Sequence, residues 1–335
     1  MAFRQRLHEI QHRSNLADGC LAETGLTMTT SRQQRQQPTT EPGRPALAQE
    51  EHDAMDIGIG LPVLRPDPGL SIVDWARRAE VRGFSTLGST DRLVYDNYEP
   101  LTALAVAAGA TSRIRLTTGI LLAPLRANHA LFAKSAATLD RLSGGRLVLC
   151  LAPGAREDDY RASRLDFQRR GKLFDSLLET ATRQWQGHDG IGPRPATPGG
   201  PQLLFGGFAT PALRRMVTYG RGWIGGAQGV ENFRSLLPGV RQAWQDAGKA
   251  GEPRLVAIAH FALGPGAEER LHNSLASYYT SGTYIRESIE AGLATPEKVA
   301  REVAAYTEAS CDELILFPHG GGLEQVDLLA DAVGL

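Results

Sequence analysis

Apolar and polar positions along the chain repeat with the periods of strands and helices in turn. The clearest example comprises a mainly apolar segment at 115–122, an amphipathic segment at 130–142 and a second apolar segment at 147–151. The SGG sequence at 143–145 ends the helical segment, because glycine adopts left-handed φ at little cost. Two mainly apolar strands joined by a helix lie parallel and are covered on both faces. The pattern therefore predicts an α/β domain.

The same alternation of strand and helix continues through the chain. It predicts eight strands, at 56–61, 84–88, 115–122, 147–151, 202–205, 223–226, 254–263 and 312–317. A long helical region at 267–292 precedes the helix that begins at Thr295-Pro296, and the charged segment 155–164 is expected to be a loop. Eight βα units predict a (β/α)8 TIM barrel with a helical insertion near the C-terminus. A doubly wound open sheet is the alternative.

Residues 1–54 differ in character from the rest. They are rich in Gln, Arg, Thr and Pro, have almost no apolar periodicity and lack the apolar core of a secretion signal. We expect a disordered N-terminal extension at 1–54 and a barrel domain at 55–335. Because the barrel pattern begins abruptly after Met55, a product that starts at Met28 or a misassigned start is the alternative.

The composition restricts the function classes. The chain has 335 residues, 42% of them hydrophobic, and a formal net charge of −1, with four lysines and no basic block, so a nucleic acid is not expected as the main partner. Cys20, Cys150 and Cys311 are too few and too widely spaced for a disulfide framework or a zinc cluster, which favours a reducing cytoplasm. No apolar run approaches the roughly 20 residues that cross a bilayer, so a membrane-spanning role is not expected.

Five motifs follow one another in the predicted barrel domain. They read IGIGLPV, GFSTLGSTDRLVYDNYEPL, APLR followed by TLDRLSGGRLVLCLAPG, GGFATPALRRM and CDELILFP. In this order they resemble the luciferase-like flavin monooxygenases, and the resemblance extends from Met55 to the C-terminus. It implies a (β/α)8 barrel, a reduced FMN that reacts with oxygen to oxygenate a small organic substrate, and a homodimer.

The loop after the fifth predicted strand is the strongest candidate for a phosphate site. Active sites of (β/α)8 barrels lie at the carboxyl ends of the strands, and the loop Gly206–Pro211 leads directly into a helix N-terminus. The N–H groups and the helix dipole favour an anion there, and the glycines let the backbone approach it. The alternative is that Thr210 only caps its own helix. The resemblance implies that Gly206, Gly207, Ala209 and Thr210 bind the flavin phosphate.

Further cofactor-binding residues follow strands two, three and four. The resemblance implies that Arg126, in the P-x-R element, approaches the phosphate or the ribityl arm, to which a guanidinium is well suited. A solvated loop arginine is the alternative. The resemblance also implies that Thr118-Gly119 backs the isoalloxazine ring, although a lone glycine often marks only a bulge. Thr90 and Gly154, which follow strands two and four, complete the set.

The loop after strand two supplies the catalytic candidates Asp91, Arg92 and Tyr95. Many members of the family that the chain resembles have Asp-His where this sequence has Asp91-Arg92. Arginine stays protonated and cannot act as a base at neutral pH. We therefore expect Arg92 to hold an anionic substrate or a flavin oxyanion, and Asp91 to orient it or to cap the loop. Tyr95 and Tyr98 are candidates for the wall of the site, with simple packing as the alternative.

Other polar residues are weaker candidates. The acidic segment 157–160 and His319 follow strands four and eight, so they could border the site, but a solvated acidic face and a surface histidine are the simpler expectations. His129 begins a helix and His260 lies within a strand, and a satisfied core role is expected for both.

Several catalytic classes lack their motifs. All four lysines fall in helical segments or at their ends, and the histidines are dispersed. The motif G-x-S-x-G is absent, and no G-x-G-x-x-G fingerprint follows a predicted strand. We expect no metal and no nicotinamide-binding domain, and therefore a separate flavin reductase as partner. The sequence predicts a flavin-dependent monooxygenase that uses reduced FMN and O2. The alternatives are a hydride-transfer oxidoreductase that uses the deazaflavin coenzyme F420, and a non-catalytic flavin-binding partner subunit, which the departure at Arg92 suggests.

Overall fold

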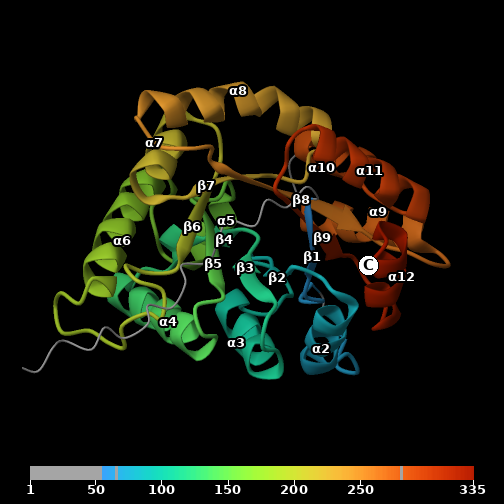
Figure 1. Cartoon of the computed structure of the whole chain (residues 1–335), viewed down its shortest axis with the longest axis horizontal. Helices are drawn as coiled ribbons and strands as arrows, with labels where there is room; N and C mark the ends of the chain where they lie inside the picture. The colour runs from blue at the N-terminus through green and yellow to red at the C-terminus, as the bar shows by residue number, and fades with distance from the viewer. Residues whose placement is uncertain (1–54, 65–66, 280–281) are drawn as a thin grey trace, which may run out of the picture. The chain divides into compact units, whose positions relative to one another are not determined.

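Eight parallel strands close into a barrel (Figure 1). The computed structural model describes residues 55–64, 67–279 and 282–335, so the predicted disorder of 1–54 lies outside the described residues. The strand segments are β1 (Asp56–Gly60), β2 (Thr86–Ser89), β3 (Arg115–Thr118), β4 (Leu121–Leu122), β5 (Leu147–Ala152), β6 (Gln202–Gly206), β7 (Gly222–Gly225), β8 (Arg254–Phe261) and β9 (Glu313–Pro318).

The ring closes because the third predicted strand pairs on both sides. Its first segment, β3, pairs with β2 and β5, and its second segment, β4, pairs with β5. Thr117 pairs with Val148 and Leu121 with Leu151, so one extra residue lies on the third strand. This residue makes a bulge at the cis peptide bond Gly119–Ile120. The closed ring confirms the predicted TIM barrel, and the open-sheet alternative is wrong.

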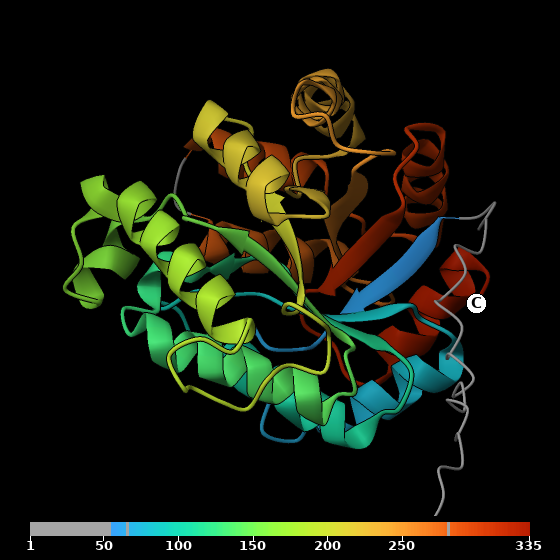
Figure 2. The same cartoon turned by 60° about the vertical axis from the view of Figure 1, so that its left-hand side comes forward.

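A helix follows each strand and lies outside the ring (Figure 2). Two of the sequence signals for helix ends are in place: Ser71 Oγ accepts a hydrogen bond from the N–H of Asp74 at 3.2 Å, and Gly144 and Gly145, with φ of 71° and 87°, follow the third helix. The outer helices are α2 (Ile72–Arg82), α3 (Pro100–Ala110), α4 (His129–Leu142), α6 (Arg170–Trp185), α7 (Thr210–Tyr219), α8 (Val230–Asp246), α11 (Pro296–Glu308) and α12 (Glu324–Val333).

The predicted helical insertion consists of two helices, α9 (Ala267–Tyr278) and α10 (Gly282–Glu290), between β8 and α11. The predicted loop 155–164 needs a correction, because it contains the short helix α5 (Glu157–Ala162). Acidic residues occupy the first turn of α5, where they interact favourably with the helix dipole. The 3-10 helices η1 (Ala123–Leu125) and η2 (Phe167–Arg169) complete the elements.

The barrel interior is filled by its own small apolar cluster, separate from the larger core between the strands and the outer helices. The ring of Phe317 lies at its centre. A Cβ added to Gly60, Gly88 or Gly119 would lie 2.4, 2.7 or 2.6 Å from an atom of this ring, so three neighbouring strands need glycine to accommodate it. The other buried members of this cluster are Val148, Cys150, Leu204, Ile224, Ala227, Val256, Ile258 and Ile315.

The amino-terminal end of the barrel is closed by a network of charged residues around Glu313, which is 4% exposed. Its carboxylate pairs with Arg115 at 3.1 Å and with Arg254 at 2.7 Å, and it accepts a hydrogen bond from Ser85 Oγ at 2.7 Å. Burial alone would raise the pKa of Glu313, but the two guanidinium groups and the hydroxyl donors hold it below its ordinary value. Glu313 is therefore ionised and fully paired.

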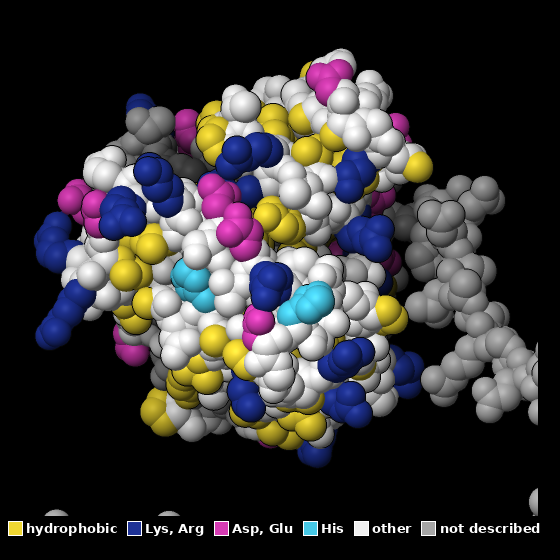
Figure 3. All heavy atoms as spheres, turned by 90° about the vertical axis from the view of Figure 1, so that its left-hand side faces the viewer, with side chains coloured by type: hydrophobic (Ala, Val, Ile, Leu, Met, Phe, Trp, Pro, Cys, Tyr) yellow, Lys and Arg dark blue, Asp and Glu magenta, His cyan; other side chains and the backbone are white. Residues whose placement is uncertain are grey.

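Side chains of different kinds are interspersed over the surface drawn in Figure 3, where apolar, basic and acidic groups lie next to one another. No helix in the described part of the chain combines the length and the apolar character that a membrane span requires. Cys150 and Cys311 are buried free thiols.

Candidate functional site

The interior rows of β8 and β9 end in a pair of histidines. Side chains alternate along a strand, so the interior row of β9 runs Glu313, Ile315 and Phe317, and His319 follows directly after the strand. The corresponding row of β8 ends in His260. Both histidines therefore lie at the carboxyl end of the barrel, where (β/α)8 enzymes build their active sites.

The two histidines form the centre of a hydrogen-bonded chain. His319 Nε2 lies 2.8 Å from His260 Nδ1. On the outer sides, His319 Nδ1 lies 2.7 Å from Ser274 Oγ, and His260 Nε2 lies 2.7 Å from Tyr279 Oη. Burial lowers the pKa of His260 to about 3, and burial together with His260 lowers the pKa of His319 well below 6.5. Both rings are therefore neutral at neutral pH.

The position of His319 corrects the expectation of a surface histidine. His319 is 0% exposed because its side chain continues the interior row of β9 and is covered by Ser274 of α9. The core role expected for His260, which is 3% exposed, is confirmed. Sequence reasoning missed the pairing of the two rings. The available signal was strand alternation, because His260 and His319 stand two residues after the interior residues Ile258 and Phe317.

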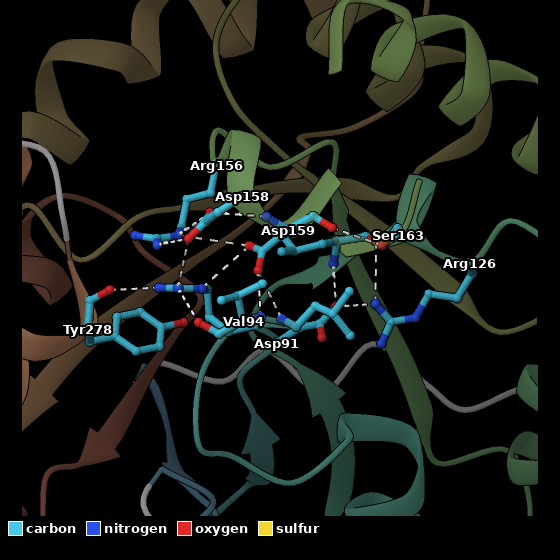
Figure 4. Close-up of polar contacts among 11 residues, drawn as sticks. Asp91, Val94, Arg126, Arg156, Asp158, Asp159, Ser163 and Tyr278 are labelled. Carbon is cyan, nitrogen blue, oxygen red and sulfur yellow. Dashed lines mark hydrogen bonds and ion pairs between the residues drawn. The ribbon is translucent and has the colours of Figure 1, made fainter. Parts of the chain in front are cut away.

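Arg92 is held by the protein at the same end of the barrel; several of its partners are labelled in Figure 4. Its side chain is buried, and its two terminal nitrogens donate to the carbonyls of Tyr278 and Val94 at 2.7 and 2.9 Å. Its Nε lies 3.4 Å from Asp159 Oδ2, and its guanidinium lies 5.5 Å from the ring centre of Tyr95. Arg92 thus ties the loop after β2 to α5 and to the end of α9. The substrate contact expected for it stays a prediction.

Asp159 corrects the expectation for the acidic segment 157–160. The side chain of Asp159 is fully buried, and its Oδ1 accepts hydrogen bonds from the N–H groups of Leu93 and Val94 at 3.2 and 2.7 Å. Helix α5 turns Asp159 and Tyr160 inward and leaves Glu157 exposed. The segment is therefore solvated on one side only, and its other side supports the loop after β2.

Asp91 and Arg126, for which different roles were predicted, form a buried ion pair (Figure 4). Asp91 Oδ2 also accepts from the N–H of Leu122 at 2.8 Å, and Arg126 Nη2 donates to Glu99 at 3.0 Å. Burial raises the pKa of Asp91, and Arg126 and the amide of Leu122 offset only part of this rise. Burial alone would lower the pKa of Arg126, but the carboxylates of Asp91 and Glu99 raise it. The pair joins the loops after strands two and three, and the phosphate contact of Arg126 stays a prediction.

Tyr95 packs beside the Arg92 contacts. Its hydroxyl lies 2.7 Å from Ser277 Oγ, and its ring meets that of Tyr278 edge-on, with 5.2 Å between the ring centres. Tyr98 is 41% exposed. These contacts show Tyr95 joining the loop after β2 to α9, in agreement with the packing alternative, and its catalytic role stays a prediction.

The N-terminus of α7, the predicted phosphate site, has no side-chain cap. Ala209 is the N-cap residue and Thr210 begins the helix, so the alternative in which Thr210 caps its own helix is wrong. Gly207 has φ of 95°, which favours glycine, and residues 207–210 are exposed. A Cβ on Gly206 would lie 3.0 Å from Ile120 Cδ1. The loop therefore adjoins the bulge of strand three.

Three of the other predicted cofactor residues are constrained by the barrel itself. Thr118 Oγ1 donates to the carbonyl of Cys150 at 2.8 Å and accepts from its N–H at 3.0 Å, and it bridges the strands at the bulge. The ring of Phe317 occupies the space beside Gly119. Gly154 has φ of 73°, which favours glycine directly after β5.

Thr90 differs from these three residues. It is 3% exposed, and its hydroxyl has no hydrogen-bond partner among the described residues. The hydroxyl of Ser89 shares this property. A buried hydroxyl without a partner costs about 1–3 kcal/mol, and a ligand that bonded to it would remove that cost. Thr90 is thus the predicted cofactor residue with unused hydrogen-bonding capacity.

A separate open depression lies at the N-terminus of α9. It has a volume of about 620 Å³ and contains none of the predicted site residues. The described residues also contain no group of three or more His, Cys, Asp and Glu side chains that could hold a metal ion. The depression is lined by Gly264, Gly266, Ala267, Glu268, Glu269, His272 and Ala294.

Comparison with known proteins identifies the family. The sequence profile described as luciferase-like monooxygenase matches residues 47–308. The chain belongs to the luciferase-like monooxygenase family. This luciferase-like protein is 25% identical over 284 residues to an uncharacterised protein of Mycobacterium tuberculosis, an alignment that covers 74% of this chain and 95% of that protein. It is 38% identical over 95 residues to the 5,10-methylenetetrahydromethanopterin reductase of Methanolobus tindarius. This alignment covers 28% of each of the two chains.

Solved structures share the fold of this luciferase-like protein. Monooxygenase RslO1 from Streptomyces bottropensis is 23% identical, with a TM-score of 0.69, over 84% of this chain and 97% of that one. An F420-dependent secondary alcohol dehydrogenase, in complex with an F420–acetone adduct, is 16% identical with a TM-score of 0.68, over 84% and 99%. At these identities the likeness establishes the fold, and the resemblance predicted from the motifs is confirmed by the family match.

Proposed function

We propose that this luciferase-like protein is a flavin-dependent monooxygenase that binds reduced FMN at the carboxyl end of its barrel and oxygenates a small organic substrate. The observation that carries the proposal is the uncapped N-terminus of α7 beside the left-handed Gly207. A helix N-terminus with free N–H groups and no competing side chain favours a phosphate. Reduced FMN would supply the electrons, and O2 the oxygen atom that the substrate gains.

The described residues fit a flat, phosphorylated coenzyme. Residues 207–210 are exposed, and their backbone amides would bind the phosphate. The hydroxyl of Thr90 is buried and lacks a partner among the described residues, so it would form a hydrogen bond with a polar group of the coenzyme or substrate. The contacts of Arg92 with Tyr278 and Asp159 hold the surrounding loops together, which helps to keep water from the reacting atoms.

A binding titration with a matched pair of glycine variants tests this proposal. Gly207→Ala places a side chain at φ of 95°, where a non-glycine residue costs roughly 1–2 kcal/mol, so we expect the free loop to relax to another conformation. FMN binding then has to restore the original conformation and should weaken by about tenfold. Gly109→Ala, in α3 where an added Cβ meets nothing within 4 Å, is the control. Equal FMN affinity of the two variants would contradict a phosphate site at this loop.

A second candidate is a hydride-transfer oxidoreductase that uses coenzyme F420. It is favoured by the similarity to methylenetetrahydromethanopterin reductases and to structures of F420-dependent enzymes. The uncapped α7 N-terminus suits the phosphorylated side chain of either coenzyme, so titration with FMN and with F420 in parallel discriminates between the two functions. Tight binding of FMN alone supports the monooxygenase, and tight binding of F420 alone supports hydride transfer.

We also propose a separate flavin reductase and a second copy of the chain as partners. The reductase is suggested by the sequence, in which no G-x-G-x-x-G fingerprint follows a predicted strand. The dimer is supported by α3, which contains no charged residue although Val106 is 44% exposed, and by its neighbours α2 and α4, where Val81 and Leu131 are exposed. Light scattering of two variants tests the dimer. Val106→Glu in α3 should abolish the dimer, whereas Thr218→Glu at an exposed position of α7, the control, should leave it intact.

A further inference from the structure

A row of four hydrogen-bonding groups crosses the carboxyl end of the barrel. It runs from Ser274 Oγ through the rings of His319 and His260 to Tyr279 Oη, with successive distances of 2.7, 2.8 and 2.7 Å. The two rings are buried, whereas Ser274 and Tyr279 are partly exposed. The row therefore connects two partly exposed groups through two buried rings.

The row has two self-consistent arrangements of protons. A neutral imidazole carries one N–H donor and one acceptor nitrogen. If Ser274 donates to His319, then His319 donates to His260 and His260 donates to Tyr279. If Tyr279 donates to His260, every hydrogen bond in the row is reversed. A proton taken up or released at one end of the row is therefore balanced at the other end. Both rings are neutral before and after the transfer.

We propose that Ser274, His319, His260 and Tyr279 form a proton relay that delivers one proton to an oxygen atom bound at the carboxyl end of the barrel. This inference rests on the proposed function. The accepting oxygen atom belongs either to reduced dioxygen or to the organic substrate. The proton transfer to it is the same in both cases. Tyr279 Oη gives its proton to that oxygen and receives one from His260 Nε2. His260 Nδ1 receives a proton from His319 Nε2, His319 Nδ1 receives one from Ser274 Oγ, and water reprotonates Ser274.

Asp91 and Arg92, the first two ionisable groups of the loop after β2, are committed to other contacts. Arg92 cannot release a proton at neutral pH, and its nitrogens contact Tyr278, Val94 and Asp159. Asp91 is paired with Arg126. The relay thus supplies the proton-transfer capacity that the strand-two loop lacks.

The first test needs no coenzyme. Nitrogen-15 NMR of the histidine rings reports which ring nitrogen carries the proton. Ser274→Ala removes the terminal donor, and we expect the tautomer populations of both His319 and His260 to change, although the hydroxyl of Ser274 bonds to His319 and not to His260. Ser274→Thr keeps a hydroxyl and should restore them, and Ser277→Ala, one turn further along α9, is the control. If Ser274→Ala leaves the tautomer of His260 unchanged, the two rings are not coupled and the relay is wrong.

The second test measures the proton delivery. Bound anionic reduced FMN reacts with O2 and one proton to give FMN and hydrogen peroxide, so the reaction consumes the proton that the relay would supply. We expect Tyr279→Phe to slow it by about 10²-fold, the lower part of the range for a positioned acid, and to change its solvent isotope effect, with FMN affinity unchanged. The control is Tyr306→Phe, because the buried hydroxyl of Tyr306 has no partner among the described residues.

The outcomes of the two tests separate the relay from the proposed function. An unchanged rate and isotope effect in Tyr279→Phe with FMN bound would overturn the relay while the flavin site remained. If FMN does not bind to the unmodified protein, the proposed function fails, and the NMR measurement still decides whether the four groups are coupled.

Discussion

The two ends of the barrel are built from opposite kinds of polar group. At the amino-terminal end, the carboxylate of Glu313 is ionised and surrounded by Arg115, Arg254 and hydroxyl donors. At the carboxyl end, the paired rings of His260 and His319 are neutral. At the carboxyl ends of their strands, the hydroxyls of Ser89 and Thr90 have no partners among the described residues, and the N-terminus of α7 has no side-chain cap. One end is satisfied internally, whereas the other retains capacity for a ligand.

The largest effect should come from the satisfied end. Glu313→Gln leaves the partly buried guanidinium groups of Arg115 and Arg254 without the buried carboxylate that they share, and we expect the free energy of unfolding to fall by about 3 kcal/mol. Urea unfolding measures the change. Glu231→Gln, which alters an exposed ion pair with Arg234, is the control and should change stability little. Equal losses in the two variants would show that the network around Glu313 stabilises the fold no more than an exposed ion pair does.

The pH dependence of stability should distinguish the two ends. The pKa of His260 is lowered from 6.5 to about 3 in the folded protein, so below pH 6.5 the unfolded chain binds protons that the folded one does not. Stability then falls by about 1.4 kcal/mol per pH unit for each such histidine. Ser274, Tyr279 and Phe317 face the pair and carry no charge at neutral pH. Glu313, whose pKa is lowered from 4.5, loses its contribution only at more acidic pH, as the pH falls below 4.5.

Urea unfolding between pH 7 and pH 5, in the unmodified protein and in histidine variants, measures the contribution of the two histidines. The double variant His260→Gln, His319→Gln should show a flatter dependence in this range than the unmodified protein, whereas Glu313→Gln should flatten it only at lower pH. Exposed His188→Gln is the control. A double variant as pH-sensitive as the unmodified protein would mean that the two rings are not held neutral.

A smaller effect is expected in the wall between the two ends. Thr118→Val removes the hydroxyl that bonds both backbone groups of Cys150, and the buried N–H and C=O left unpaired should cost about 1–3 kcal/mol. Thermal or urea unfolding checks this value. Thr138→Val on the exposed side of α4 is the control, and a loss no larger than in this control would refute the bridging role of Thr118.

The smallest change in stability should come from the carboxyl end of the barrel, which retains unused hydrogen-bonding groups. Thr90→Val replaces a buried hydroxyl that has no partner among the described residues, so stability should stay the same or rise by up to about 1 kcal/mol. The same variant should bind FMN about tenfold more weakly, equivalent to one hydrogen bond of about 1.4 kcal/mol. Lower stability with unchanged FMN binding would assign Thr90 to the wall and not to the ligand.

Much of the fold could be predicted from the sequence because its signals are local. Alternating strand and helix patterns gave the eight strands, and Ser71 with Asp74 marked a helix start. The bulge at Gly119–Ile120 could not be predicted, since it depends on the register of β3 and β5 against each other. Helix α5 was missed because its charged sequence resembles a loop until Asp159 is paired with the distant loop after β2.

The candidate site could be predicted only in part. The phosphate site proposed at the α7 N-terminus could be predicted because the glycine loop and the start of the helix are adjacent in sequence. The ion pair of Asp91 with Arg126 and the contacts of Arg92 depend on which loops meet in space, and residue types alone do not specify that. The pairing of His260 with His319 lies between these cases, because strand alternation and neighbouring strands predict it once the barrel is accepted.

In the proposed function, the carboxyl end of the barrel binds a phosphorylated flavin-type coenzyme through the N-terminus of α7. Calorimetric titration of the full chain with FMN, coenzyme F420 and riboflavin, which lacks the phosphate, tests it most directly. If the phosphate is held there, FMN or F420 binds at least about tenfold more tightly than riboflavin, consistent with the roughly 1.5–3 kcal/mol of a charge-assisted hydrogen bond. Riboflavin affinity equal to that of FMN, with no binding of F420, would contradict it.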